Sequence, residues 1–408
     1  MAEADIRNIL VIGIDVVSLA ASARRAGYQV YAVDYFGDQD LKHVCHESRS
    51  IIKQRIGETC GQVGTGFSPE TLLQLTKDLL REDKIDAALL SSGLDDSPDV
   101  LSELNDLIPI LGNLPNVIRK VRDKMEFLRE LKRLGIPHPE TAFAQNFEEA
   151  KKKSKDIGYP VVVKPSSGFG GAGIRKVQSR QELEQTFREV PSLNEKVLIQ
   201  GHISGTPASA SLISSTDKAV VLTLNEQLLG MREVGQREPF GYCGNVVPLS
   251  ATSAITDACK SVAEKVVLHF GLVGSNGVDL VISEEGVPHV MEVNPRFQGT
   301  LECVERVLKT NIVRAHVEAC LQGTLPTIVK KTSIFCVRLI LFAPQRSIAP
   351  DLSTFEEIRD IPLPGIIVEE SEPVCSVVIE GASRESLLRK AMGTTELIYK
   401  LLRSHSNR

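Results

Sequence analysis

The chain has 408 residues, a hydrophobic content of 42%, a charged content of 24% and a formal net charge of -5. These values are typical of a globular protein with two to four domains, and the lack of a long basic run argues against a nucleic-acid partner. No apolar run approaches the length of a membrane span, so no membrane partner is predicted. The eight cysteines are scattered without metal-ligand spacing, which indicates reduced thiols and a cytoplasmic protein.

The first 118 residues alternate between apolar and amphipathic runs, as in a doubly wound α/β unit. We expect strands and helices in turn over residues 8–13, 16–26, 28–33, 69–81 and 86–90. The sequence Gly13-Ile14-Asp15 lacks the G-x-G-x-x-G fingerprint, which argues against a dinucleotide site. Ser91-Ser92-Gly93 follows a strand where open α/β sheets bind ligands, but an ordinary turn would have the same composition.

An acidic hairpin is the most informative stretch of the chain. Two β-rich runs, 278–282 and 287–293, flank a Ser-Glu-Glu-Gly turn. Glu292 and Asn294 are two residues apart and so share a face, which Asp279 can reach from the first strand. Three such oxygen ligands are typical of a Mg²⁺ site, and Arg296 follows where a cation could meet a carboxylate or phosphate. The alternative is an exposed hairpin with incidental acids.

A glycine-rich loop is the second informative stretch. The apolar strand 159–165 ends near Lys164, and strand-like residues 174–177 follow the loop. Four glycines lie within six residues between them, namely Gly168, Gly170, Gly171 and Gly173. Glycines let backbone N–H groups approach a phosphate closely, and a phosphate would also compensate the buried charge of Lys164. A strand-loop-strand flap over phosphates is therefore predicted, with a loop of no chemical role as the alternative.

Periodicity defines the remaining elements. We expect helices over 119–134, 255–270, 304–321 and 383–402, a meander over 197–203, 208–214 and 219–225, and strands over 335–342 and 374–380. The predicted fold class is α/β and α+β, with a doubly wound N-terminal unit and a small C-terminal β-rich cap over residues 326–408.

Taken in order, these stretches resemble the ATP-grasp superfamily of carboxylate-amine ligases over residues 119–325. The resemblance implies a Rossmann-like first domain over residues 1–118, a two-lobed central domain over 119–325 with a flap subdomain over about 137–205, and a cap over 326–408. The resemblance rests on Asp123-Lys124, Val163-Lys164-Pro165 with its glycine-rich flap, the segment 200–205, Asp279, and Glu292-Val293-Asn294-Pro295-Arg296. Residues 208–211, 224–227 and 242–245 are similar to an archaeal-type subgroup of predicted carboligases and tyramine–glutamate ligase-like enzymes. The tail, with Pro364-Gly365 and residues 373–376, is similar to that of biotin-carboxylase-like members.

The resemblance implies a role for each matching residue. The nucleotide would be bound by Lys124, Lys164, Ser166, Gly168, Gly170, Gly171, Gly173, Gln200, Gly201, His202 and Ile203. Asp279, Glu292 and Asn294 would hold Mg²⁺ or Mn²⁺, and Arg296 and Lys164 would act in catalysis. Many members carry a glutamate for the ribose hydroxyls where this chain has Gly201 and Ala208, so the ribose contact is not predicted.

The implied function is an ADP-forming, carbon–nitrogen bond-forming ligase. It would activate a carboxylate with ATP as an acyl phosphate and join it to an amine, with no side-chain nucleophile. Small-molecule carboxylate and amine substrates are the expected partners, together with a possible homodimer. Two alternatives remain open: a bicarbonate-using carboxylase of biotin-carboxylase-like type, and a non-catalytic nucleotide-binding protein.

Overall fold

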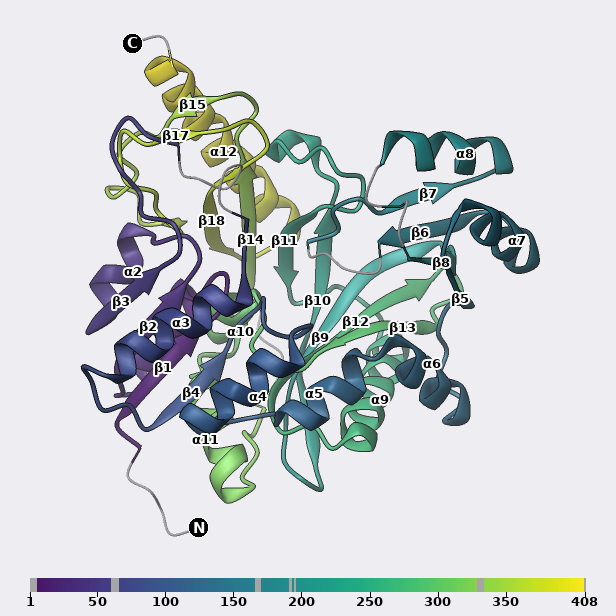
Figure 1. Cartoon of the computed structure of the whole chain (residues 1–408), viewed down its shortest axis with the longest axis horizontal. Coiled ribbons are helices and arrows are strands. Elements are labelled where there is room, and N and C mark those ends of the chain that lie inside the picture. Colours follow the sequence, from purple (N-terminus) through teal and green to yellow (C-terminus); the bar gives the residue numbers. More distant parts are fainter. Residues whose placement is uncertain are drawn as a thin grey trace.

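One long antiparallel sheet organises the molecule, with a smaller sheet on each side of it in the computed structural model (Figure 1). The structure describes residues 6–59, 66–165, 170–190, 193, 196–328 and 334–406, with side chains up to residue 402. The mixed α/β fold class is confirmed. Among these residues, no helix has both the length and the apolar character to cross a membrane.

The N-terminal sheet is parallel and has the strand order β3-β2-β1-β4. Its strands are β1 (Asn8–Ile12), β2 (Gln29–Asp34), β3 (Glu47–Ser50) and β4 (Ala87–Leu90). Its helices are α1 (Val17–Arg25), α2 (Gln39–Val44), α3 (Pro69–Leu80) and α4 (Pro98–Leu107). The predicted alternation is present, although β3 was missed because its residues, Glu-Ser-Arg-Ser, lack a strand-like apolar pattern.

The large sheet has eight strands in the order β13-β12-β9-β10-β11-β14-β18-β16. They are β9 (Gly205–Ser214), β10 (Ala219–Leu229), β11 (Tyr242–Val247), β12 (Gly274–Ser283), β13 (Pro288–Asn294), β14 (Phe335–Phe342), β16 (Ile358–Arg359) and β18 (Pro373–Gly381). The C-terminal strands thus continue the sheet that contains the acidic hairpin β12–β13. Residues Arg232–Val234 form a 3₁₀ turn after β10, and β15 (Ser347–Ile348) pairs with β17 (Ile367–Val368) beside the large sheet.

A third sheet, in the order β5-β8-β6-β7, lies against one side of the large sheet (Figure 1). It consists of β5 (Thr141–Ala144), β6 (Val161–Pro165), β7 (Arg175–Val177) and β8 (Val197–Gly201), and it is covered by α7 (Phe147–Ile157) and α8 (Arg180–Glu189). The predicted meander was therefore wrong for its first strand. The chain leaves strand conformation over residues 202–204 and passes from this sheet to the large one.

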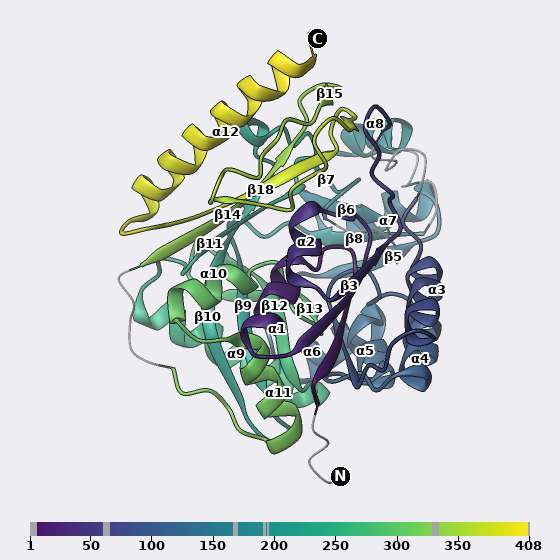
Figure 2. The same ribbon diagram turned by 90° about the vertical axis from the view of Figure 1, so that its left-hand side faces the viewer.

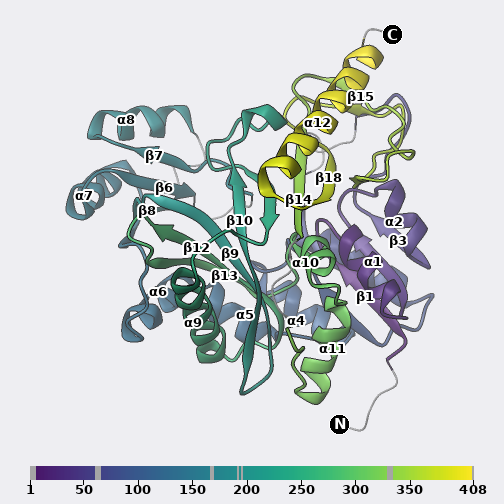
Figure 3. The ribbon, with the colours of Figure 1, turned by 180° about the vertical axis from the view of Figure 1, so that it is seen from behind.

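Helices cover the outer face of the large sheet. Figure 3 shows α9 (Ser253–Phe270), α10 (Leu301–Leu308) and α11 (Ile312–Gln322) on this face, and Figure 2 shows α12 (Arg384–Ser406) along β14 and β18. Apolar side chains of α9 pack on those of β9 and β12 in one buried cluster. Apolar side chains therefore cover this face of the sheet, and the candidate site forms on the opposite face.

Two predicted single helices are each broken into two. The first, 119–134, is α5 (Pro115–Arg122) and α6 (Lys124–Arg133), because the Asp123 carboxylate accepts hydrogen bonds from the first N–H groups of α6. The second, 304–321, is α10 and α11, because Lys309 has a left-handed backbone and the side chain of Asn311 caps the second helix. In both cases a capping residue overrides apolar periodicity.

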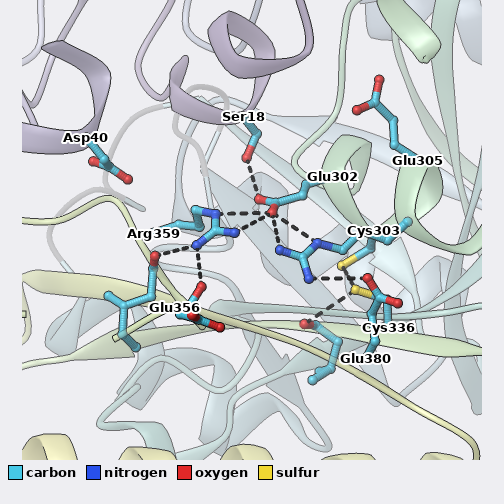
Figure 4. Close-up of polar contacts among 12 residues, drawn as sticks. Ser18, Asp40, Glu302, Cys303, Glu305, Cys336, Glu356, Arg359 and Glu380 are labelled. Atoms are coloured by element: carbon cyan, nitrogen blue, oxygen red, sulfur yellow. Dashed lines mark hydrogen bonds and ion pairs between the residues drawn. The ribbon is translucent and has the colours of Figure 1, made fainter. Parts of the chain in front are cut away.

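An ionic network joins the N-terminal unit to the large sheet (Figure 4). The Glu302 carboxylate accepts hydrogen bonds from Arg306 at 2.7 Å and from Arg359 at 3.1 Å. Its other oxygen accepts from the Ser18 hydroxyl of α1 at 3.4 Å, and Arg306 also donates to Glu380 at 3.3 Å. Although burial raises the pKa of Glu302, the guanidinium groups of Arg359 and Arg306 lower it overall. The network therefore fixes α1 relative to α10, β16 and β18.

A buried histidine predicts how stability depends on pH. His316 Nδ1 accepts a hydrogen bond from the Ser275 N–H at 2.7 Å, and its Nε2 donates to the Leu111 carbonyl at 2.9 Å, so the folded protein holds the neutral ring. Burial lowers its pKa from 6.5 to about 4. The unfolded chain therefore binds an extra proton between these values, and stability falls as pH decreases from 6.5 to 4, by about 3 kcal/mol from this group.

Urea unfolding at a series of pH values measures this effect. We expect His316→Asn to lower stability at pH 7 and to show a shallower loss between pH 6.5 and 4 than the unchanged protein. His43→Asn, at an exposed histidine of α2, is the matched control and should keep the original slope. Identical slopes for all three proteins would contradict the assignment.

Candidate active site

A cavity of about 1390 Å³ lies where the three main sheets meet. It is lined by most of the residues predicted to act, namely Lys124, Lys164, Gly170, Gly171, Gln200, Gly201, His202, Ile203, Asp279, Glu292, Asn294 and Arg296. Gly173 does not line the cavity, but the next residue, Ile174, does. Ser166 and Gly168 lie outside the described residues. Segments more than 150 residues apart thus contribute to one space.

The acidic hairpin places its polar side chains on the cavity wall. Asp279 of β12 stands opposite Glu292 of β13, and Gly277 stands opposite Asn294. The Asn294 side-chain amide donates to Asp279 Oδ2 at 3.1 Å, and the Gln227 amide of β10 donates to Asp279 Oδ1 at 3.0 Å. Asp279 is therefore held from two strands, and Gln227 is a contact that the hairpin sequence alone did not indicate.

The two carboxylates affect each other's protonation. Burial and the charge of Glu292 raise the pKa of Asp279 to about 7. The ammonium of Lys124, 3.0 Å from Glu292 Oε2, holds the pKa of Glu292 well below its usual range, with a further contribution from Arg122. The negative charge of Glu292 disfavours ionisation of Asp279, and a bound divalent cation would offset the repulsion between the two carboxylates. Two carboxylates and an amide, completed by water and phosphate oxygens, suit the hard oxygen shell of Mg²⁺.

Lys164 lies at the end of β6 and faces the same region. Burial lowers the pKa of Lys164 to about 8. The negative charge of Glu292 partly offsets this shift, and the positive charge of Lys124 adds to it. A lysine with this pKa is still mainly charged at neutral pH, and a nearby anion would restore the usual pKa of the ammonium. The pair Lys124 and Lys164 thus provides two cations beside the acidic hairpin.

Two arginines beside the hairpin, Arg296 and Arg122, are held by acids of the N-terminal unit. Arg296 donates from Nε to Asp95 at 2.8 Å and from its terminal nitrogen to Asn294 Oδ1 at 3.2 Å. Arg122 makes a two-point contact with Asp96 at 2.7 and 2.8 Å. We predicted Arg296 but not its partner. The only signal for Asp95 and Asp96 was their place just after Ser91-Ser92-Gly93, at the carboxyl end of β4.

The described part of the glycine-rich loop packs against the connection between β10 and β11 of the large sheet. Gly171 has a φ of +82° and approaches Phe240 so closely that a Cβ there would lie 1.9 Å from the Phe240 carbonyl oxygen. The Gly173 N–H donates to Glu238 at 3.0 Å, and Glu238 also pairs with Arg175 of β7. Residues 170–175 therefore fold over the cavity, with glycine required at position 171.

Gln200 and His202 line the cavity, and each has a buried polar atom without a partner among the described residues. Gln200 donates to Thr141 at 3.0 Å, but its Oε1 is buried without a hydrogen-bond partner among the described residues. His202 Nδ1 is also buried without a hydrogen-bond partner among the described residues. Burial lowers the pKa of His202, so the ring is neutral at pH 7. Buried polar atoms normally have partners, so these two leave hydrogen-bonding capacity unused beside the cavity.

The chain is similar in sequence to known proteins. An uncharacterized protein of Methanocaldococcus jannaschii is 26% identical over 376 residues, which are 90% of this chain and 87% of that protein. The arginine-specific carbamoyl phosphate synthase large chain of Bacillus subtilis is 28% identical over 243 residues, 59% of this chain but only 23% of that enzyme. This chain therefore matches less than a quarter of the synthase's length.

Solved structures share the fold over nearly the whole chain. The biotin carboxylase domain of Hydrogenobacter thermophilus 2-oxoglutarate carboxylase has a TM-score of 0.75 at 17% identity, covering 97% of this chain and 94% of that one. The L-amino acid ligase of Bacillus licheniformis has a TM-score of 0.68 at 15% identity, covering 98% and 97%. A family model described as an ATP-grasp domain matches residues 121–300, which include every described candidate residue of the acidic hairpin and the flap. The chain therefore carries an ATP-grasp domain.

Proposed function

We propose that the protein is an ATP-dependent ligase that activates a carboxylate as an acyl phosphate and joins it to an amine. The observation that carries the proposal is the convergence of Lys124, Lys164 and the paired acids Asp279 and Glu292 in one cavity beneath a glycine flap. Phosphoryl transfer between two anions needs this kind of charge neutralisation and needs no side-chain nucleophile.

Each candidate residue has a part in this proposal. Lys124, Lys164 and the flap glycines bind the phosphates, and the segment from Gln200 to Ile203 binds the base. Asp279, Glu292 and Asn294 hold Mg²⁺ or Mn²⁺, which would neutralise phosphate charge. Arg296, kept in place by Asp95, receives the substrate carboxylate.

The reaction balances in two steps. A carboxylate oxygen attacks the γ-phosphorus of ATP, the bond to the β,γ-bridging oxygen breaks, and ADP leaves. The amine nitrogen then attacks the acyl carbon, phosphate leaves, and the nitrogen loses a proton, which gives an amide. The flap excludes water, which would otherwise hydrolyse the acyl phosphate.

The comparisons support this class of reaction without naming the substrates. The L-amino acid ligase shares the fold over nearly the full length of both chains. A second candidate is a carboxylase that activates bicarbonate, because the biotin carboxylase domain with the TM-score of 0.75 was solved with MgADP and bicarbonate. Division of the chain near residues 118 and 325, a homodimer and a cytoplasmic location remain predictions.

An ADP-release screen distinguishes the candidates. Purified protein with MgATP is tested against amino acids and other carboxylates, each with and without primary amines, and against bicarbonate alone. The proposal expects ADP and phosphate only when a carboxylate and an amine are both present, with an amide detected by mass spectrometry. ADP release with bicarbonate alone would favour the carboxylase, and nucleotide binding without ADP release under any condition would favour a non-catalytic role.

A further inference from the structure

The flap segment, residues 170–175, runs into a short strand at the edge of the third sheet. This strand, β7, has three residues and is the last in the order β5-β8-β6-β7, so among the described strands it pairs with β6 on one side and with none on the other. Short edge elements with few contacts open more easily than the core of a sheet. The position of the flap segment over the cavity therefore depends on contacts outside the third sheet.

The large sheet supplies these contacts through the β10–β11 connection, residues 230–241, and the first residue of β11. The backbone N–H of Tyr242 donates to the Gly170 carbonyl at 2.9 Å. The backbone at Gly171 lies directly against the Phe240 carbonyl. Side chains of the connection and residues of the flap segment together line one part of the cavity. The flap segment and the connection thus meet along their backbones at the cavity wall.

Glu238 adds a side-chain contact to this attachment. Its Oε2 accepts hydrogen bonds from the Gly173 N–H at 3.0 Å and from Arg175 Nη1, and its Oε1 accepts from Arg175 Nη2 at 3.3 Å. The hydrogen bonds from Arg175 lower the pKa of Glu238, although burial opposes them, so the carboxylate is ionised at neutral pH. One charged acceptor therefore holds two residues of the flap segment at the same time.

The β10–β11 connection holds Glu238 in a fixed place. The Glu238 N–H donates to Gln236 Oε1 at 3.0 Å, and the Glu238 carbonyl accepts from the Gly241 N–H at 2.9 Å. Gly235 has a φ of +79°, and a Cβ there would lie 2.3 Å from the carbonyl oxygen of Phe342, the last residue of β14. The connection is therefore packed against a C-terminal strand, and Glu238 extends from a firm base.

Glu238 is poorly placed to act as a ligand for a metal ion or a substrate. It lines the cavity, but both of its oxygens already accept hydrogen bonds from Arg175, and one also accepts from Gly173. A cation would have to displace the Arg175 guanidinium before it could bind this carboxylate. The contacts therefore favour a role in placing the flap segment.

We propose that Glu238 is a positioning residue that keeps the flap segment closed over the cavity by holding Gly173 and Arg175 against the β10–β11 connection. The consequence for turnover rests on the proposed ligase function. A closed flap keeps water from the acyl phosphate, whereas an open flap lets water attack it. Water then takes the place of the amine, the carboxylate and inorganic phosphate are released, and ADP is formed without an amide.

Hydrogen exchange of the full-length protein without nucleotide tests the position of the flap segment. We expect the amides of residues 170–177 to exchange about tenfold faster in Glu238→Ala, because the substitution removes a charged acceptor of three hydrogen bonds. Glu233→Ala, at an exposed acid of the same connection, is the matched control and should leave the exchange unchanged. Exchange of β9 should be the same in all three proteins, which separates local opening from a loss of global stability.

A second variant tests whether Arg175 acts through Glu238. Arg175→Gln should also speed exchange over residues 170–177, but less than Glu238→Ala does, because the hydrogen bond from Gly173 remains. Adding Arg175→Gln to Glu238→Ala should change little, since the ion pair is already lost. Additive effects of the two substitutions would contradict the pair as the means of holding the flap segment.

The amounts of ADP and amide provide the readout that a purely structural role would not change. With a substrate pair found in the ADP-release screen, the unchanged protein should form ADP and amide in equal amounts, and Glu238→Ala should raise the ratio of ADP to amide about twofold or more. A substitution that only destabilised the fold would lower both products together.

The outcomes separate this inference from the proposed ligase function. Unchanged exchange over residues 170–177 in Glu238→Ala, or faster exchange with an unchanged ratio of ADP to amide, would overturn the positioning role even if the protein proves to be a ligase. If exchange over these residues depends on Glu238 while no carboxylate and amine pair releases ADP, Glu238 still holds the flap segment and the ligase function fails.

Discussion

Glu292→Gln is expected to lower ADP formation by about 10²–10³-fold while the protein stays folded. The substitution keeps the shape of the side chain but removes the negative charge that faces Asp279 and pairs with Lys124 at 3.0 Å. A divalent ion would lose a charged ligand, and Lys124 would lose its partner. Loss of the pairs with Lys124 and Arg122 is offset by relief of the repulsion that raises the pKa of Asp279, and the Glu292 side chain is 38% exposed, so the net cost to stability should be small.

Steady-state ADP release and thermal unfolding measure the two effects of this substitution. Glu284→Gln is the matched control, because it makes the same chemical change on an exposed residue in the turn of the same hairpin. The control should keep full turnover. Undiminished ADP release in Glu292→Gln would contradict the metal-binding role, and a collapse of the melting temperature would assign Glu292 a structural role instead.

Local periodicity predicted most of the fold because it reports which face of an element is buried. Strand β14 spans the predicted residues 335–342, and the hairpin β12–β13 pairs about the predicted turn. The two helix failures have a local chemical cause. Apolar residues keep helical spacing across Asp123 and Asn311, but a side chain that caps a new helix ends the old one. The sheet to which each strand belongs depends on contacts between distant segments, so β8 could not be separated from β9.

The candidate site also combines residues that local rules predict with contacts between distant segments that they do not predict. Glu292 and Asn294 could be placed on one face because strand alternation is a local rule. The acid that fixes Arg296 comes from a loop about 200 residues earlier, and no pattern near Arg296 points to it. Arg338 likewise joins Asp15 and Asp360 from opposite ends of the chain. Ion pairs of this kind arise only when the fold brings the segments together.

Arg296→Lys is expected to reduce carboxylate-dependent ADP release by about 100-fold with little change in affinity for MgATP. The lysine would keep a positive charge beside Asp95, whose side chain is 9% exposed, so the buried acid would not be left without a partner. It would lose the planar fork that donates at once to Asp95, to Asn294 and to the Phe297 carbonyl. A compact ammonium cannot hold these contacts and also receive a carboxylate at two points.

Separate titrations of the carboxylate and of MgATP test this specificity. The loss should appear as a higher KM for the carboxylate and a lower kcat, while the MgATP affinity measured by calorimetry stays within about threefold. Arg129→Lys, at an exposed arginine of α6, is the matched control and should leave both unchanged. If Arg296→Lys instead weakens MgATP binding and spares the carboxylate KM, the guanidinium contacts the nucleotide, and the carboxylate must be received by another cation of the cavity.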